Sequence, residues 1–120
     1  SGMEEEAMRL NAKPVYEVYE ISWSDLVDAM TQWIRETFGQ EANPVIYYDD
    51  EFFNAIYVQF HEEDVAYEAF QQEYHGNTFL LAEAIIRDLF QLEVETYSGV
   101  AIVRSYEDEE DYVHVFKYIR

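Results

Sequence analysis

The chain has no cysteine, only two prolines, and seven lysine or arginine residues against 26 aspartate or glutamate residues. Without cysteine there is no disulfide framework and no thiolate-ligated metal, which fits a reducing compartment. No apolar run approaches the roughly 18 residues of a membrane span, and the acidic N-terminus does not resemble a signal peptide. We therefore expect a protein of the cytoplasm, with no contact to a membrane.

Positive charge is missing altogether from residues 36–86, which hold eleven carboxylates and no lysine or arginine. The net charge of −19 is far from the magnitude of about 2–8 that is usual for a small domain. Such a charge opposes compaction, so it needs an explanation: solubility, a salt-rich habitat, or a basic binding partner. Direct binding to nucleic acid is not expected, because neutralising phosphates requires lysine and arginine.

Aromatic residues are abundant, with eleven tyrosines, eight phenylalanines and two tryptophans. Disordered acidic chains are poor in aromatics, so we expect a folded protein. A length of 120 residues predicts one domain with a core of its own. Ser1-Gly2 before Met3 is typical of an expression-tag remnant. Residues 1–13 should therefore be this remnant plus a flexible acidic arm, and residues 14–120 a single acidic α+β domain.

A few residues mark where helices start and stop. Ser22, with Asp25 three positions later, predicts the start of a helix that Gly39 ends, and Gly76-Asn77 should separate two later helices. The expected elements are a strand at Val15–Ile21, a helix to Phe38, strands at Val45–Tyr48 and Phe52–Phe60, a helix opening at Glu62, a helix from Thr78 to Phe90, a short strand at Leu92–Tyr97, and strands at Val100–Tyr106 and Tyr112–Ile119.

The order β-α-β-β-α, followed by an added helix and a C-terminal β-hairpin, predicts an α+β fold. We expect one largely antiparallel sheet with three helices on one face and a ferredoxin-like core. Seven apolar residues at helical or strand spacing should contribute to the core: Trp33, Ile34, Phe70, Ile85, Leu89, Ile102 and Val115.

Part of the chain resembles the RNA-recognition-motif family. Tyr57-Val58-Gln59-Phe60, then Ala66 and Ala69, then Tyr74 and Gly76, are similar to the third strand and second helix of that family. For residues 15–76 the resemblance implies the ferredoxin-like fold. It does not imply RNA binding, because Phe53 and Ala55 stand where the family's strand motif has a basic residue and an exposed aromatic.

A second stretch resembles antirestriction proteins of the ArdA type, which are acidic inhibitors that mimic nucleic acid. The segment Phe70-Gln71-Gln72-Glu73-Tyr74-His75-Gly76, followed by a helix with Ala82 and Glu83, is similar to their acidic helical segment. The similarity covers about 25 residues. It implies an inhibitor that binds a nucleic-acid-processing enzyme.

Three acidic clusters are candidates for chemistry: Asp49-Asp50-Glu51, Glu62-Glu63-Asp64 and Glu107–Asp111. Hard cations require six or more oxygens in a shaped loop, and the glycine-containing EF-hand spacing is absent. Glycoside hydrolysis by paired carboxylates requires a cleft and one shifted pKa. Solvated turns and helix starts are the simpler interpretation. We therefore expect no metal, no cofactor and no enzymatic activity.

The histidines and tyrosines lead to different expectations. His61, His75 and His114 have no spacing typical of a zinc site, so we interpret them as surface residues. The eleven tyrosines exceed what one small core can hold, and strand residues alternate between faces, so some must be exposed. Exposed tyrosines among carboxylates suit a protein-binding surface, although ordinary β-propensity would also explain them.

These features favour a binding protein whose acidic face mimics nucleic acid and inhibits a nucleic-acid-processing protein, of the viral antirestriction or anti-CRISPR type. Carboxylates at positions i and i+4 of a helix are neighbours, as Asp64 and Glu68 would be, at a spacing comparable with that of adjacent phosphates. The alternatives are an immunity protein for a nuclease toxin and an acid-rich housekeeping or assembly module. The sequence also leaves homodimer formation open.

The predicted partner is a basic nucleic-acid-binding protein. The residues predicted to bind it come from the two acidic clusters of the lysine-free region and from the helix that follows: Asp49, Asp50, Glu51, Glu62, Glu63, Asp64, Glu68 and Glu73.

Overall fold

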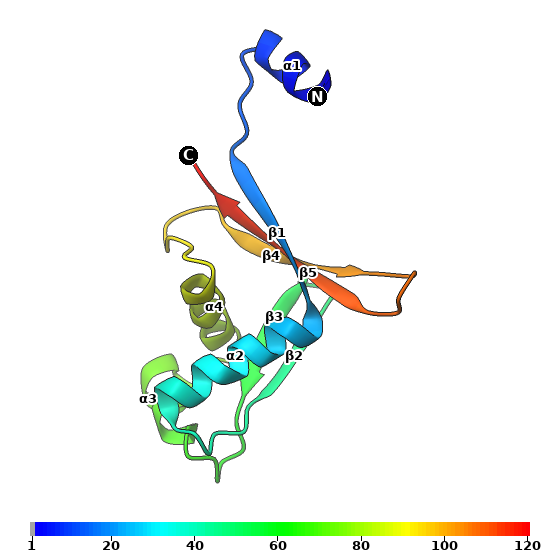
Figure 1. Ribbon diagram of the computed structural model, residues 1–120. Coiled ribbons are helices and arrows are strands. Elements are labelled where there is room, and N and C mark those ends of the chain that lie inside the picture. Colours follow the sequence, from blue (N-terminus) through cyan, green and yellow to red (C-terminus); the bar gives the residue numbers. More distant parts are fainter. Residues whose placement is uncertain (1) are drawn as a thin grey trace.

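The computed structural model describes residues 2–120 and shows an α+β protein with four helices and antiparallel sheets (Figure 1). The elements in chain order are α1 Gly2–Arg9, β1 Tyr16–Ser22, α2 Trp23–Phe38, β2 Val45–Asp49, β3 Ala55–Gln59, α3 Tyr67–Tyr74, α4 Thr78–Leu89, β4 Gly99–Arg104 and β5 Asp111–Tyr118. No helix among these residues is long and apolar enough to cross a membrane.

The main sheet has the strand order β1-β5-β4, so strands from opposite ends of the chain lie side by side. Both pairs are antiparallel, and Val113 and Val115 of the central strand are fully buried. Figure 1 shows α2, α3, α4 and the β2–β3 hairpin together on one side of this sheet. The core therefore lies between the sheet and these elements.

Helix α2 supplies the central apolar stripe of the core. Leu26, Met30 and Ile34, spaced by four residues along one face, are all fully buried. Ser22 caps the helix by accepting a hydrogen bond from the Asp25 N–H at 3.2 Å, and Gly39 follows its last turn with a positive φ. The sequence prediction for both ends of this helix is confirmed.

The β2–β3 hairpin forms a separate two-stranded sheet, and β3 packs against α4. Asn54 connects it to the main sheet, because its side-chain oxygen accepts a hydrogen bond from the Ile102 N–H of the edge strand β4. Asn77 caps α4 by accepting from the N–H groups of Phe79 and Leu80, both at 3.0 Å.

The expected single sheet with a ferredoxin-like core is not confirmed. Strand β1 pairs with β5 over seven residues and not with β3, and the five strands divide into two sheets. The physical reason is that β5 offers β1 a long apolar partner, which buries Val113 and Val115 beneath α2. There are also four helices instead of three, because the N-terminal arm forms α1.

Two elements begin several residues later than predicted, and one predicted strand is absent. Strand β3 begins at Ala55 instead of Phe52, because the Asp49 carboxylate turns the preceding loop. Helix α3 begins at Tyr67 instead of Glu62, because Asp64 caps a tight turn before it. Residues 92–97 form turns and no strand, since the Arg87 guanidinium donates to the Glu93 carbonyl there.

The predicted core is largely confirmed. Ile34, Phe70, Ile85, Ile102 and Val115 are buried, while Trp33 and Leu89 are partly buried against them. Several tyrosines are exposed, as expected, and the most open are Tyr97 and Tyr106.

Candidate functional site

The loop between β2 and β3 is shaped by the first carboxylate of its acidic run. Asp49 accepts hydrogen bonds from three consecutive backbone N–H groups, those of Glu51 at 3.0 Å, Phe52 at 3.2 Å and Phe53 at 3.4 Å. These donors favour the ionised form and hold the pKa of Asp49 below its usual value. The loop is therefore ordered by the same charge that makes it acidic.

The loop between β4 and β5 is built in the same way around Asp108. Its carboxylate accepts from the Tyr112 hydroxyl at 2.8 Å and from the Glu110 N–H at 3.2 Å. Hydrogen bonds from the Ser105 and Tyr112 hydroxyls lower the pKa of Asp108, and the Glu110 N–H adds to this effect. The hydrogen bond between Tyr112 and Asp108 also raises the pKa of Tyr112 to about 12, because deprotonation would place a phenolate beside a carboxylate.

Arg104 joins the two loops. Its guanidinium lies 3.1 Å from Asp50 of the β2–β3 loop and 3.5 Å from Asp111 at the start of β5. Asp50 and then Asp111 raise the pKa of Arg104. The Tyr48 hydroxyl donates to Asp111, and the Trp23 ring packs edge-on against Tyr48 with centroids 4.6 Å apart. Both loops are thus anchored to α2 and to each other.

We call the resulting group of carboxylates the tip cluster. Its members are the acidic residues of the two hairpin loops, Asp49, Asp50, Glu51, Glu107, Asp108, Glu109, Glu110 and Asp111. The two loops with Arg104 thus carry eight carboxylates and one guanidinium, a formal charge of 1 − 8 = −7. Glu51, Glu107 and Glu109 are exposed, whereas Glu110 accepts a hydrogen bond from Ser24 at 3.0 Å. The cluster is a fixed patch of negative charge at one end of the protein.

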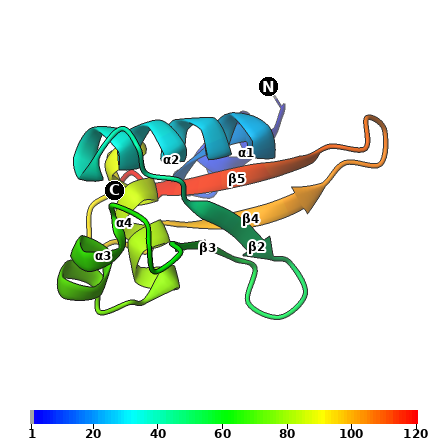
Figure 2. The same cartoon turned by 90° about the horizontal axis from the view of Figure 1, so that it is seen from below.

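The other predicted binding residues lie elsewhere. Figure 2 shows the two hairpin loops at one end of the molecule and α3 at the other. Between them runs β3, five residues long and so roughly 16 Å at about 3.3 Å per residue. The structure therefore separates Asp49, Asp50 and Glu51 from the remaining five predicted residues, Glu62, Glu63, Asp64, Glu68 and Glu73.

The acids near α3 do not present the expected helical pair. Asp64 precedes the helix, and its carboxylate accepts from the Asn43 N–H at 2.8 Å and from the Ala66 N–H at 2.9 Å. Glu68 accepts from the Gln72 side chain at 3.1 Å. Glu62, Glu63 and Glu73 are exposed. The spacing argument for Asp64 and Glu68 on one helix face is wrong, although the acids still form a second, looser acidic patch.

Sequence reasoning recognised Glu107–Asp111 as an acidic hairpin tip but left it out of the predicted binding residues, and it did not anticipate Arg104. The missing information is the set of side-chain contacts that brings the two hairpins together, although they belong to different sheets. A local signal did exist, since Arg104 is the one basic residue between Arg87 and Lys117 and lies three positions before Glu107, the first residue of the acidic run.

The raised pKa of Tyr112 gives a direct test of this geometry. In the folded protein Tyr112 should ionise at about pH 12, above the ordinary value of 10, so its contribution to stability should be lost as the pH rises from 10 through 12. The pH at which Tyr112 ionises is measured as the difference between the ultraviolet titration curves of the parent and of Tyr112→Phe. Asp108→Asn should return the Tyr112 ionisation toward pH 10; an unchanged value would mean that Asp108 is not the cause.

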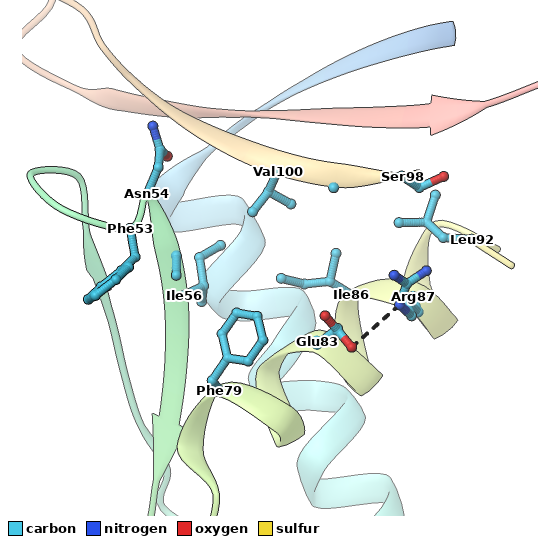
Figure 3. Close-up of a pocket in the computed structure, with 12 residues that line it drawn as sticks. Phe53, Asn54, Ile56, Phe79, Glu83, Ile86, Arg87, Leu92, Ser98 and Val100 are labelled. Carbon is cyan, nitrogen blue, oxygen red and sulfur yellow. Dashed lines mark ion pairs between the residues drawn. The ribbon is translucent and has the colours of Figure 1, made fainter. Parts of the chain in front are cut away.

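A pocket of about 280 Å³ lies between α4, the start of β3 and β4 (Figure 3). Apolar side chains such as Ile56, Phe79 and Ile86 line it, and the Glu83–Arg87 ion pair, with 3.7 Å between Arg87 Nε and Glu83 Oε1, borders it. Ser98 supplies the hydroxyl group of the lining, and this hydroxyl is hydrogen-bonded to the Thr96 hydroxyl and accepts from the Tyr118 N–H. The lining offers no nucleophile–base pair, so it does not indicate a reaction.

The histidines lie apart from one another. His114 is 2.9 Å from Glu20 on the neighbouring strand, while His61 accepts from the Glu63 N–H through Nδ1 and His75 ends α3. Within residues 2–120, no group of three or more histidine, aspartate or glutamate side chains could hold a metal ion.

The chain matches no protein-family model, no curated protein and no solved structure. The two resemblances noted in the sequence therefore stay predictions.

Proposed function

We propose that this chain is an acidic binding protein that mimics nucleic acid and occupies the basic nucleic-acid-binding surface of another protein, as an inhibitor of the antirestriction or anti-CRISPR type. The observation that carries this proposal is the tip cluster, in which two loops distant in sequence are joined by Arg104 and together carry eight carboxylates. We place this activity in the cytoplasm of a bacterium or of a phage-infected cell.

The ordered conformation of the two loops supports the proposal. A mobile acidic segment would lose binding free energy on becoming ordered, whereas a preorganised one does not. Asp49 and Asp108 each hold their own loop through backbone N–H groups, and Arg104 holds the loops together. A binding surface built in this way keeps its two loops in place before the partner arrives.

The surroundings of the cluster also suit a protein partner. Phe52 and Phe53, in the same loop as Glu51, are 79% and 78% exposed, and Tyr106, next to Glu107, is 88% exposed. Exposed aromatic side chains are the usual anchors of protein interfaces. The charges would direct the approach to a basic groove, and the aromatic rings would supply the close contacts.

The test is competition with nucleic acid. The protein is immobilised, a nuclease-treated bacterial lysate is passed over it, and bound proteins are eluted with salt and identified. Each is then mixed with fluorescent duplex DNA or single-stranded RNA, and the anisotropy is followed as the soluble acidic protein is added. We expect the nucleic acid to be released from at least one captured protein. If the captured proteins keep their nucleic acid at saturating concentrations of the acidic protein, the proposed function is wrong.

A further inference from the structure

One face of the main sheet is uncovered. On the central strand β5, Val113 and Val115 point into the core, so the alternating residues Tyr112, His114 and Phe116 point to the opposite side. Figure 1 shows α2, α3, α4 and the β2–β3 hairpin on the core side only. We call the opposite side the open face.

Apolar side chains also lie at the edges of the open face. Val18 of β1 lies beside Phe116, and Val103 of β4 lies beside Tyr112. These two valines are 54% and 38% exposed. In water, such a surface favours association with another apolar surface.

Charge is nearly absent from this face, although the protein carries −19 overall. The strands contribute one carboxylate to it, Glu20, which pairs with His114 at 2.9 Å in the middle of the sheet. Asp108 of the tip cluster reaches only the margin, where it accepts a hydrogen bond from the Tyr112 hydroxyl. Because the strand residues of this face carry too little negative charge to attract a basic partner, the surface that covers the face should itself be apolar and nearly neutral. A second copy of the same face meets this requirement.

The size of the face can be compared with what a dimer needs. Eight residues of β5 span about 26 Å, and three strands about 4.8 Å apart cover about 14 Å, so two faces contribute roughly 700 Å². Stable interfaces bury about 1,200 Å² or more. The remaining area has to come from an element beside the sheet.

Helix α1 is such an element. It has eight residues and none of them is buried, and an isolated helix shorter than about 12 residues is marginal in water. Met3, Met8 and Leu10, in α1 and just after it, are each at least 75% exposed. Figure 1 shows α1 held away from the body beyond the start of β1, on the side opposite α2, α3 and α4.

We propose that the protein forms a two-fold symmetric dimer in which the open faces of two copies pack against each other and α1 of each copy covers apolar surface at the margin. This inference is independent of the proposed function, because it uses a different surface. Its salt dependence also has the opposite sign: added salt screens the repulsion between two acidic copies and tightens the dimer, whereas it weakens binding of the tip cluster to a basic partner.

Sedimentation equilibrium of the full chain, over a range of protein and salt concentrations, tests the dimer. We expect the mass to rise from 14.3 kDa toward twice that value with protein concentration, at lower concentrations when salt is added. The double variant Val18→Glu with Val103→Glu should weaken the dimer at least about tenfold, because like charges would be buried opposite each other. Circular dichroism and thermal melting establish that the variant is folded.

The matched control places the same two substitutions on exposed valines elsewhere, Val45→Glu with Val94→Glu, which are 50% and 79% exposed. This control should dimerise like the parent. The milder pair Val18→Thr with Val103→Thr keeps the β-branched shape and should weaken the dimer without adding charge. A parent that stays monomeric at all concentrations and salts, or an open-face variant that dimerises as well as the control, overturns the proposal. A monomer that captures another protein through this face also overturns it.

Discussion

Replacing Glu51, Glu107 and Glu109 with glutamine should slow association with the basic partner by about tenfold at low ionic strength, since opposing fields raise association rates by roughly 10- to 1000-fold. These three carboxylates are exposed members of the tip cluster, and no hydrogen bond or ion pair is shown for their carboxylates. Their removal should therefore leave Asp49, Asp108 and Arg104 to hold the loops. Stopped-flow or surface-plasmon measurement of the association rate, at several salt concentrations, is the readout.

The matched control neutralises the same number of charges near α3, through Glu62→Gln, Glu63→Gln and Glu73→Gln. These side chains are also exposed, and the protein loses the same three negative charges. If the tip cluster meets the partner, the α3 variant should associate at nearly the parental rate. If the α3 variant is the slower of the two, the binding surface is the one predicted from residues 62–73. Equal effects would mean that only the overall charge matters.

Much of the local structure follows from the sequence, because its signals are short-range. Ser22 as a cap and Gly39 as a stop are each defined by hydrogen bonds within a few residues. Both β-hairpins are likewise predicted from acidic turn residues between apolar runs. Side-chain competition for backbone N–H groups explains the errors: Asp49 and Asp64 take N–H groups that a longer strand and a longer helix would have used.

The arrangement of the sheets could not be predicted in the same way. Strand β1 pairs with β5 across almost the whole chain, as in Tyr16 opposite Tyr118, and no local pattern specifies this partner. The tip cluster likewise depends on contacts between two hairpins that are distant in sequence, since Arg104 lies beside Asp50 and Tyr48 donates to Asp111. The sequence thus indicated the acidic character of the functional surface, but only the fold shows which of its acids lie together.

The prediction with the largest effect on stability concerns the core beneath the sheet. Ile34→Ala should lower the free energy of unfolding by about 2–5 kcal/mol, because Ile34 is fully buried and the lost methyl groups leave a cavity. At roughly 4 °C per kcal/mol for a chain of this size, the melting temperature should fall by about 8–20 °C.

The matched control for this core substitution is Ile119→Ala, because Ile119 is 43% exposed at the end of the chain and the same atoms are removed without leaving a cavity. Surface substitutions usually change stability by no more than about 0.5 kcal/mol. Urea unfolding followed by tryptophan fluorescence measures both variants, since Trp33 is adjacent to Ile34 in α2. If Ile34→Ala were no more destabilising than Ile119→Ala, then α2 would not pack against the sheet through the stripe formed by Leu26, Met30 and Ile34. The anchoring of the tip cluster through Trp23, at the start of the same helix, would then be in doubt as well.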